Sequence, residues 1–326
     1  MIPGLLRTGV SFALLALLAW WLDASAVLDR LAGFDPRWAL VAVAISLPQI
    51  ALLAFRWRFT AGRLGLDLPF GAALREYYLA TFLNQVLPGG VMGDVSRAWR
   101  HGRAGPERRL GPAARAVILE RTSGQVVMGG IAALSLASLP LAFSAVPVTL
   151  ALAVCGVGVA ALAALLAFRQ RARSGPLATL GRDVHTALLA RDALPAQLLS
   201  STLVVGTYLA TYVVAARAVG VSTPLWTLLP LVAPVLLSML VPATVAGWGV
   251  REATAAALWG AVGLTVVDGV AISAAYGILV LVSSLPGALM LLSSSRDRRG
   301  AHLPEMAAEL DEPDDSSDRT IQEPSP

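Results

Sequence analysis

The chain has 326 residues, of which 56% are hydrophobic and 14% are charged, and its formal net charge is +4. Soluble domains carry about 25% charged residues, so this composition excludes a soluble globular protein. All 25 basic residues are arginine, which also excludes an ATP-hydrolysing phosphate loop that needs lysine.

Long apolar blocks recur along the chain, and each approaches the roughly 20 residues that a helix needs to cross a bilayer. The expected spans are Leu5–Leu22, Trp38–Phe55, Val117–Phe143, Val146–Phe168, Gln197–Val219 and Val270–Leu292. The first block, with Arg7 before it and Ala24-Ser25-Ala26 after it, also resembles a cleaved secretory signal. We favour a retained first helix because the repeat described below needs it. The sequence therefore predicts an all-α polytopic membrane protein.

Two further apolar stretches, Phe70–Trp99 and Leu225–Leu264, are broken near their middles by proline and glycine. Each is long enough for two half-length helices. We expect both to form re-entrant-type hairpins whose tips lie within the membrane. Freed backbone groups are costly in hydrocarbon, so such a break persists only where it is buried in protein or lines a wet cavity.

The arginines between the apolar blocks set the orientation through the positive-inside rule. One set of segments holds 18 arginines: the N-terminus, the segments near residues 56–63, 97–115 and 169–191, and the start of the tail. The loops on the opposite side hold three. The first set is therefore expected in the cytoplasm. The sequence predicts a multi-pass protein of the cell membrane with both termini cytoplasmic.

These units occur in the order helix, helix, hairpin, helix, and the same order follows again on the opposite face. The sequence thus predicts an inverted repeat within a transmembrane domain of residues 1–295, with halves at about 5–143 and 146–292. The spacing of Pro88, Gly93 and Arg97 equals that of Pro242, Gly247 and Arg251. Interrupted helices in corresponding positions indicate a midplane binding site in transporters. Residues 296–326 are acidic and are expected to form a disordered cytoplasmic tail.

A helix that restarts after each break presents unpaired N–H groups and the positive end of its dipole, an arrangement that favours an anion. The guanidinium groups of Arg97 and Arg251 could then bind two oxygens of a lipid phosphate. The structural alternative is that Asp94 caps its helix and pairs with Arg97. The candidate substrate-binding residues are Asn84, Pro88, Gly89, Gly90, Gly93, Asp94, Arg97, Glu120, Arg121, Pro242, Gly247, Gly249, Arg251 and Glu252.

Neither a metal nor a cofactor is expected. His101, His185 and His302 lack the spacing of metal ligands, and the single Cys155 cannot form an internal disulfide. Membrane lipids are the expected partners, and no nucleic-acid partner is expected.

Four stretches carry a likeness to a known family: "RWRF" at Arg56–Phe59, "NQVLPGGVMGD" with Arg97, "ER" at Glu120–Arg121 and "VPATVAGWGVRE" at Val241–Glu252. With them the sequence resembles the flippase-like family typified by the transmembrane region of lysylphosphatidylglycerol synthases. The resemblance implies a lipid-translocating domain whose substrates are aminoacylated phospholipids or polyprenyl-linked lipids. The synthases also carry a large soluble aminoacyltransferase domain, whereas about 34 residues follow the last apolar block here, so synthase activity is not expected.

Three functions remain as hypotheses. The first is a flippase-like transporter for a lipid with an anionic head group, which is not an enzyme. The second is a non-transporting scaffold for a separate lipid-modifying or glycosyl-transferring enzyme. The third is a membrane-embedded lipid-modifying enzyme, which lacks an evident catalytic set because the nearest histidine to either break, His101, falls in a basic loop.

Overall fold

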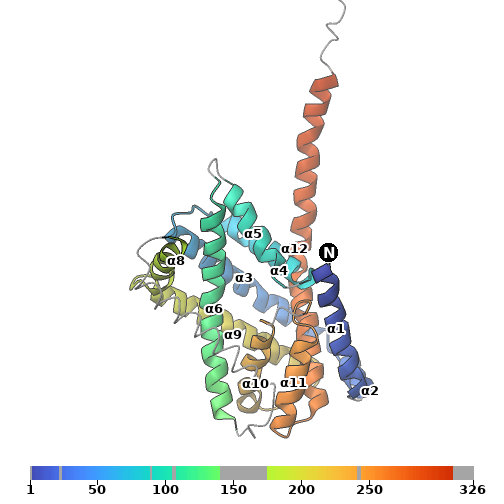
Figure 1. The fold of residues 1–326 in the computed structure, drawn as a ribbon. Helices are drawn as coiled ribbons and strands as arrows, with labels where there is room; N and C mark the ends of the chain where they lie inside the picture. The colour runs from blue at the N-terminus through green and yellow to red at the C-terminus, as the bar shows by residue number, and fades with distance from the viewer. Residues whose placement is uncertain are drawn as a thin grey trace, which may run out of the picture.

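The computed structural model describes residues 2–21, 24–88, 90–104, 108–139, 175–240 and 244–310. Within these ranges the chain forms eleven α-helices, one π-helical turn and no strand, which confirms the all-helical class (Figure 1). The helices are α1 (Ile2–Trp21), α2 (Ala24–Ala32), α3 (Arg37–Arg63), α4 (Phe70–Val86), α5 (Met92–Arg103), α6 (Leu110–Ser138), α8 (Pro176–Val184), α9 (Leu194–Ala218), α10 (Leu225–Ser238), α11 (Val250–Ala261) and α12 (Val266–Leu310), and the π-helical turn is η1 (His185–Leu189).

Three of the described helices are long and apolar enough to cross a membrane: α3, α9 and residues 266–291 of α12. A fourth span is possible if α1 and α2, which meet at a bend of 102°, count as one. The span expected at Val117–Phe143 corresponds to α6, which fails this criterion within the described residues. Charged residues occupy its N-terminal half, and residues 140–143 lie outside the described ranges.

Both expected hairpins are present as helix pairs. Pro69 precedes α4 and Pro224 precedes α10, positions where the fixed φ of proline favours a helix start. In the first pair α4 packs against α5, and in the second α10 packs against α11. The first break runs through extended Leu87 and left-handed Gly90, and the second through left-handed Ala246, Gly247 and Gly249. The breaks therefore fall where proline and glycine predicted them.

The segments expected on one side of the membrane gather at one end of the helix bundle. The end of α3 is joined to the start of α9 by the ion pair of Arg63 with Asp192. The start of α6 is joined to α8 by Arg115 and Asp183, 2.5 Å apart. At the opposite end the Asp35 N–H donates to the Ala218 carbonyl, and this grouping is consistent with the two predicted loop sets. The assignment of the first end to the cytoplasm stays a prediction.

The described residues form three hydrophobic core clusters, and two of them include residues of the hairpins. The larger one joins α6, α9, α10, α11 and α12, and it includes Tyr212 and Trp259. The smaller one joins α3, α4 and α6 around Trp57 and Tyr77. Since α6 contributes to both clusters, it connects the first hairpin to the second.

The structure differs from the sequence prediction in three places. Part of the loop expected near 169–191 is helical, as α8 and η1. A short helix, α2, follows the first span at a sharp angle. The last helix continues beyond the expected Val270–Leu292 to Leu310 and extends away from the bundle (Figure 1), so residues 296–310 of the expected disordered tail are helical.

The expected span Val146–Phe168, the tail residues 311–326 and the candidate residues Gly89 and Pro242 lie outside the described ranges. The inverted repeat depends on that span and stays a prediction.

Candidate functional site

A buried carboxylate, Glu120 of α6, lies at the centre of a charge cluster. It accepts hydrogen bonds from Arg56 Nη2 at 2.6 Å, from Arg97 Nη2 at 2.7 Å and from the Tyr77 hydroxyl at 2.9 Å. These donors come from α3, α5 and α4, which places four helices around one carboxylate. A buried ion is tolerated only with such pairing and hydrogen bonding.

A second carboxylate, Asp94 in the first turn of α5, completes what we call the first charge cluster (Arg56, Asp94, Arg97, Glu120 and Arg121). Asp94 accepts from Arg97 Nε at 2.9 Å, from Arg121 Nη2 at 2.8 Å and from the Asn84 amide at 3.1 Å. Three arginines face two carboxylates, so the cluster carries one net positive charge when both carboxylates are ionised.

The two arginines flanking Asp94 differ in exposure. Arg97 is fully buried, and its guanidinium carbon lies 4.6 Å from the ring centroid of Trp57 and 4.3 Å from that of Tyr77. Its Nη1 has no hydrogen-bond partner among the described residues, and the ring faces supply cation–π contacts in place of one. The side chain of Arg121, by contrast, is 35% exposed.

The first break depends on a close approach of two backbones. The Gly93 N–H donates to Asn84 Oδ1 at 2.7 Å, which satisfies one of the free N–H groups of α5. A Cβ at Gly93 would lie 2.0 Å from the Ala80 carbonyl oxygen. Glycine therefore lets α5 lie directly on α4 and brings Asp94 to Asn84.

The second break holds a smaller and neutral charge pair. Glu252 accepts from the Gly249 N–H and from Arg251 Nη2, both at 2.7 Å, and from the Ser273 hydroxyl at 3.0 Å. Arg251 is almost fully buried beside the rings of Trp248 and Tyr276, at 5.0 and 5.3 Å. Each hairpin arginine is thus placed beside one tryptophan and one tyrosine.

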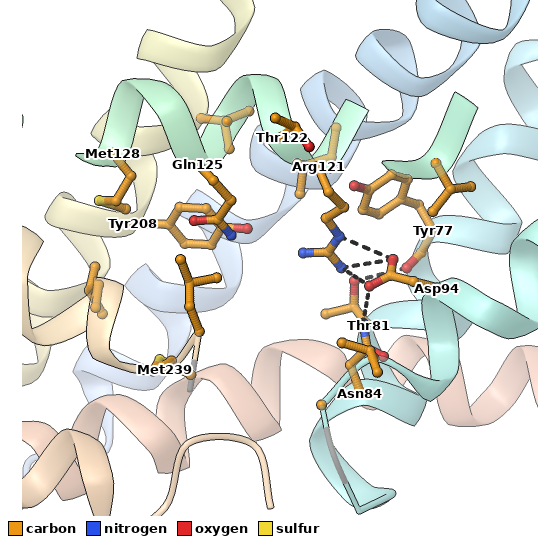
Figure 2. Close-up of a pocket in the computed structure, with 18 of the residues that line it drawn as sticks. Tyr77, Thr81, Asn84, Asp94, Arg121, Thr122, Gln125, Met128, Tyr208 and Met239 are labelled. Atoms are coloured by element: carbon orange, nitrogen blue, oxygen red, sulfur yellow. Dashed lines mark hydrogen bonds and ion pairs between the residues drawn. The ribbon is translucent and has the colours of Figure 1, made fainter. Parts of the chain in front are cut away.

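A cavity of about 1190 Å³ lies between the two hairpins, with α3, α6, α9 and α12 forming the rest of its wall. Figure 2 shows Arg121, Asp94 and Asn84 together on one side of it and Met128 and Met239 on the other. Both breaks reach the cavity, since its lining includes Gly90, Ala246 and Gly247. A Cβ at Gly90 would lie 3.9 Å from the Ala246 Cα, so the two hairpin tips meet there.

Among the sequence-predicted site residues, those that line the cavity are Asn84, Gly90, Asp94, Arg121 and Gly247. Those that lie outside its lining are Pro88, Gly93, Arg97, Glu120, Gly249, Arg251 and Glu252. Arg97 and Arg251, expected to share one phosphate, are already paired with carboxylates: Arg97 with Asp94 and Glu120, and Arg251 with Glu252. Within the described residues, Arg97 joins α5 to α6 through Glu120, and Arg251 joins α11 to α12 through Ser273. The shared phosphate stays a prediction.

Sequence reasoning did not select several cavity residues as site residues: Arg56, Tyr77, Gln125, Tyr208, Thr244 and Tyr276. One signal was available for Arg56, because it opens the "RWRF" stretch that contributes to the family likeness. Nothing in the local pattern distinguishes Tyr208 or Tyr276 from other tyrosines of membrane helices.

Residues 6–287 match the model of the family described as the lysylphosphatidylglycerol synthase transmembrane region. The chain belongs to this family. The resemblance drawn from the sequence motifs is confirmed, and with it a lipid-related function in the membrane. No curated protein and no solved structure matches the chain.

For this member of the lysylphosphatidylglycerol synthase transmembrane family, the described residues contain no group of three or more histidine, cysteine, aspartate or glutamate side chains able to hold a metal ion. The charged side chains in the cavity lining are Arg56, Asp94 and Arg121. The chemistry that this site offers is therefore recognition of charge next to a large apolar volume.

Proposed function

We propose that this protein translocates a lipid with an anionic head group between the two faces of the membrane, and that it does so without modifying the lipid. The head group would occupy the cavity between the hairpins while its hydrocarbon chains stay in contact with the bilayer. This proposal specifies the lipid-related function of the family for this chain.

The observation that carries the proposal is the position of Arg121 in the cavity. Its Nε and Nη2 bind Asp94, whereas Nη1 has no partner among the described residues and points away from Asp94 (Figure 2). The cavity, at about 1190 Å³, exceeds the roughly 300–1,000 Å³ of ordinary small-molecule sites. A guanidinium nitrogen at one end of such a volume suits a phosphate with part of its chains attached.

A route for the hydrocarbon chains lies between α5 and α6. Val95 and Trp99 of α5 and Ile118 of α6 line the cavity and are also 56%, 48% and 57% exposed. Apolar side chains that are exposed in a membrane protein face acyl chains. The cavity wall between α5 and α6 therefore supports lateral entry of a lipid, with its chains remaining outside.

The contact between the hairpin tips supports a mechanism of movement. Gly90 and Ala246 both have positive φ angles and meet across the cavity. Transporters with interrupted helices in corresponding positions alternate access by moving one half against the other. We take the two hairpins as the parts that separate to let the head group pass.

Reconstitution into vesicles tests this function. A phosphatidylglycerol labelled on an acyl chain, so that its head group stays natural, should cross the membrane faster in vesicles with the protein than in empty ones. Arg121→Gln should slow transport roughly ten- to a hundredfold, because the free energy of a charge-assisted hydrogen bond corresponds to a factor of that size. The exposed Arg75→Gln is the matched control and should transport at the normal rate.

Two results would refute the proposal. One is a transport rate equal to that of empty vesicles, which would favour the scaffold alternative. The other is a chemically altered lipid recovered after incubation and identified by mass spectrometry, which would favour the enzyme alternative.

A further inference from the structure

The carboxylates near the cavity are already paired with arginines. Asp94 receives hydrogen bonds from two guanidinium groups and one amide. Glu120 receives them from two guanidinium groups and one hydroxyl, and it does not reach the cavity lining. An ammonium group entering the cavity would therefore compete with arginine for the carboxylate of Asp94.

Unused donors, on the other hand, remain available. Arg121 Nη1 has no partner among the described residues, and its side chain is 35% exposed toward the cavity. Thr244 also lines the cavity, is 2% exposed, and has a hydroxyl without a hydrogen-bond partner in that part of the structure. A hydroxyl without a partner, in the wall of a cavity that holds excess positive charge, can donate to an anion.

The net charge of the cavity lining also favours an anionic head group. Arg56 and Arg121 against Asp94 leave one positive charge in the lining. The ion pair of Arg97 with Glu120 behind the wall adds no net charge, and neither does that of Arg251 with Glu252. Desolvated like charges repel strongly in a medium of low dielectric.

We infer that the cavity selects a lipid whose head group is a net anion without an ammonium group, and that it discriminates against the aminoacylated lipid after which the family is described. The inference rests on the proposed function and narrows its substrate class. The recognised chemistry is an unmodified phosphate, which either a phosphatidylglycerol or a polyprenyl phosphate supplies.

A binding experiment in detergent tests the selectivity apart from transport. Chain-matched phosphatidylglycerol, phosphatidylethanolamine and lysylphosphatidylglycerol are each titrated at constant ionic strength, and a polyprenyl phosphate arm distinguishes the two sources of phosphate. Native mass spectrometry or quenching of tryptophan fluorescence reports the affinity. We expect phosphatidylglycerol to bind at least tenfold more tightly than lysylphosphatidylglycerol, with phosphatidylethanolamine between them.

A charge inserted into the lining gives the sharper test. Gln125 lies one turn after Arg121 on α6 and faces the cavity (Figure 2). Gln125→Glu brings the lining to zero net charge and adds a free carboxylate, so the preference for phosphatidylglycerol should fall at least tenfold or reverse. Gln125→Ala removes the same amide without adding charge and should keep the wild-type preference.

The outcomes distinguish a failure of the selectivity inference from a failure of the proposed function. If lysylphosphatidylglycerol binds as tightly as phosphatidylglycerol, or more tightly, the inference is wrong while the proposed function stands. If none of the lipids binds, the proposed function fails as well. If Gln125→Glu does not yield a monodisperse protein, the comparison of lipids on the wild-type protein decides by itself.

Discussion

At the scale of single residues, the buried arginines of the two breaks differ from the arginine that lines the cavity. Two aromatic rings flank each of Arg97 and Arg251, and Arg97 pairs with two carboxylates whereas Arg251 pairs with one. Arg121 shares Asp94 with Arg97, yet its Nη1 has no partner in the described part of the chain. Substitution of the two kinds of arginine should therefore affect different measurements.

We predict that Arg97→Gln destabilises the protein by about 3–5 kcal/mol, because it leaves buried carboxylates with fewer partners. Denaturant unfolding in detergent measures this loss. Arg75→Gln, at an exposed position of α4, should change the unfolding free energy by less than about 0.5 kcal/mol. A normal unfolding free energy for Arg97→Gln would show that the ion pairs with Asp94 and Glu120 contribute little.

Gly93 gives a second prediction at this scale. In Gly93→Ala the new Cβ would lie 2.0 Å from the Ala80 oxygen, so α5 must move away from α4 and Asp94 from Asn84. We expect a thermal unfolding midpoint lower by several degrees and weaker lipid binding. Gly71→Ala, where nothing lies within 4 Å of the new Cβ, should leave both unchanged or raise stability slightly. Equal behaviour of the two variants would argue against close packing at the first break.

At the scale of secondary-structure elements, α1 packs against the second hairpin. The Val245 N–H donates to Ser11 Oγ at 2.8 Å, and a Cβ at Gly249 would lie 2.7 Å from the Leu14 side chain. A break in a membrane helix needs partners for its free backbone groups. The first helix supplies one for the second break, just as Asn84 supplies one for the first.

We predict that Ser11→Ala lowers the unfolding free energy by about 1–3 kcal/mol, because it leaves a backbone N–H unpaired. Ser138→Ala is the control, since its hydroxyl is exposed and bonds only within α6. Denaturant titration of both variants in the same detergent makes the comparison. A loss no larger for Ser11→Ala than for Ser138→Ala would mean that the second break does not depend on α1.

At the scale of the whole molecule, both hairpins contribute to the cavity wall, and the tips of the two hairpins meet at Gly90 and Ala246. If the head group passes between the tips, they must separate during each transport cycle. The same arrangement places the arginine-rich loops together at one end of the bundle. Both features give predictions about the intact protein.

Cross-linking the tips should stop transport. In a Cys155→Ser background, Gly90→Cys with Ala246→Cys should form a cross-link under oxidation and lose transport, and a reductant should restore it. Each single-cysteine variant should transport equally well under both conditions. Full transport by the cross-linked protein would show that the head group takes another route.

Cysteine accessibility tests the orientation. Ser222→Cys should react with a membrane-impermeant reagent added from outside, whereas Ser294→Cys should react only after the membrane is opened. Labelling in the reverse pattern would invert the assignment that the positive-inside rule gives.

The sequence alone determined the helical class, the family and both breaks. These are local or periodic properties: a run of apolar residues sets a span, and proline or glycine sets a break. The 18 arginines against three likewise predicted two sets of loops, and described parts of the two sets lie at opposite ends of the bundle. The candidate list also contained Asp94, Glu120 and Arg121, which the fold joins into one cluster.

Only the tertiary structure decided which of these charges lines the cavity. Arg97, Arg121 and Arg251 look alike in sequence, because each lies near a break or a carboxylate. Their difference arises from neighbours far away along the chain: Trp57 and Glu120 enclose Arg97, and Ser273 and Tyr276 enclose Arg251. Burial and pairing depend on which helices meet, and no local pattern encodes that, so the net charge of the cavity was fixed by packing alone.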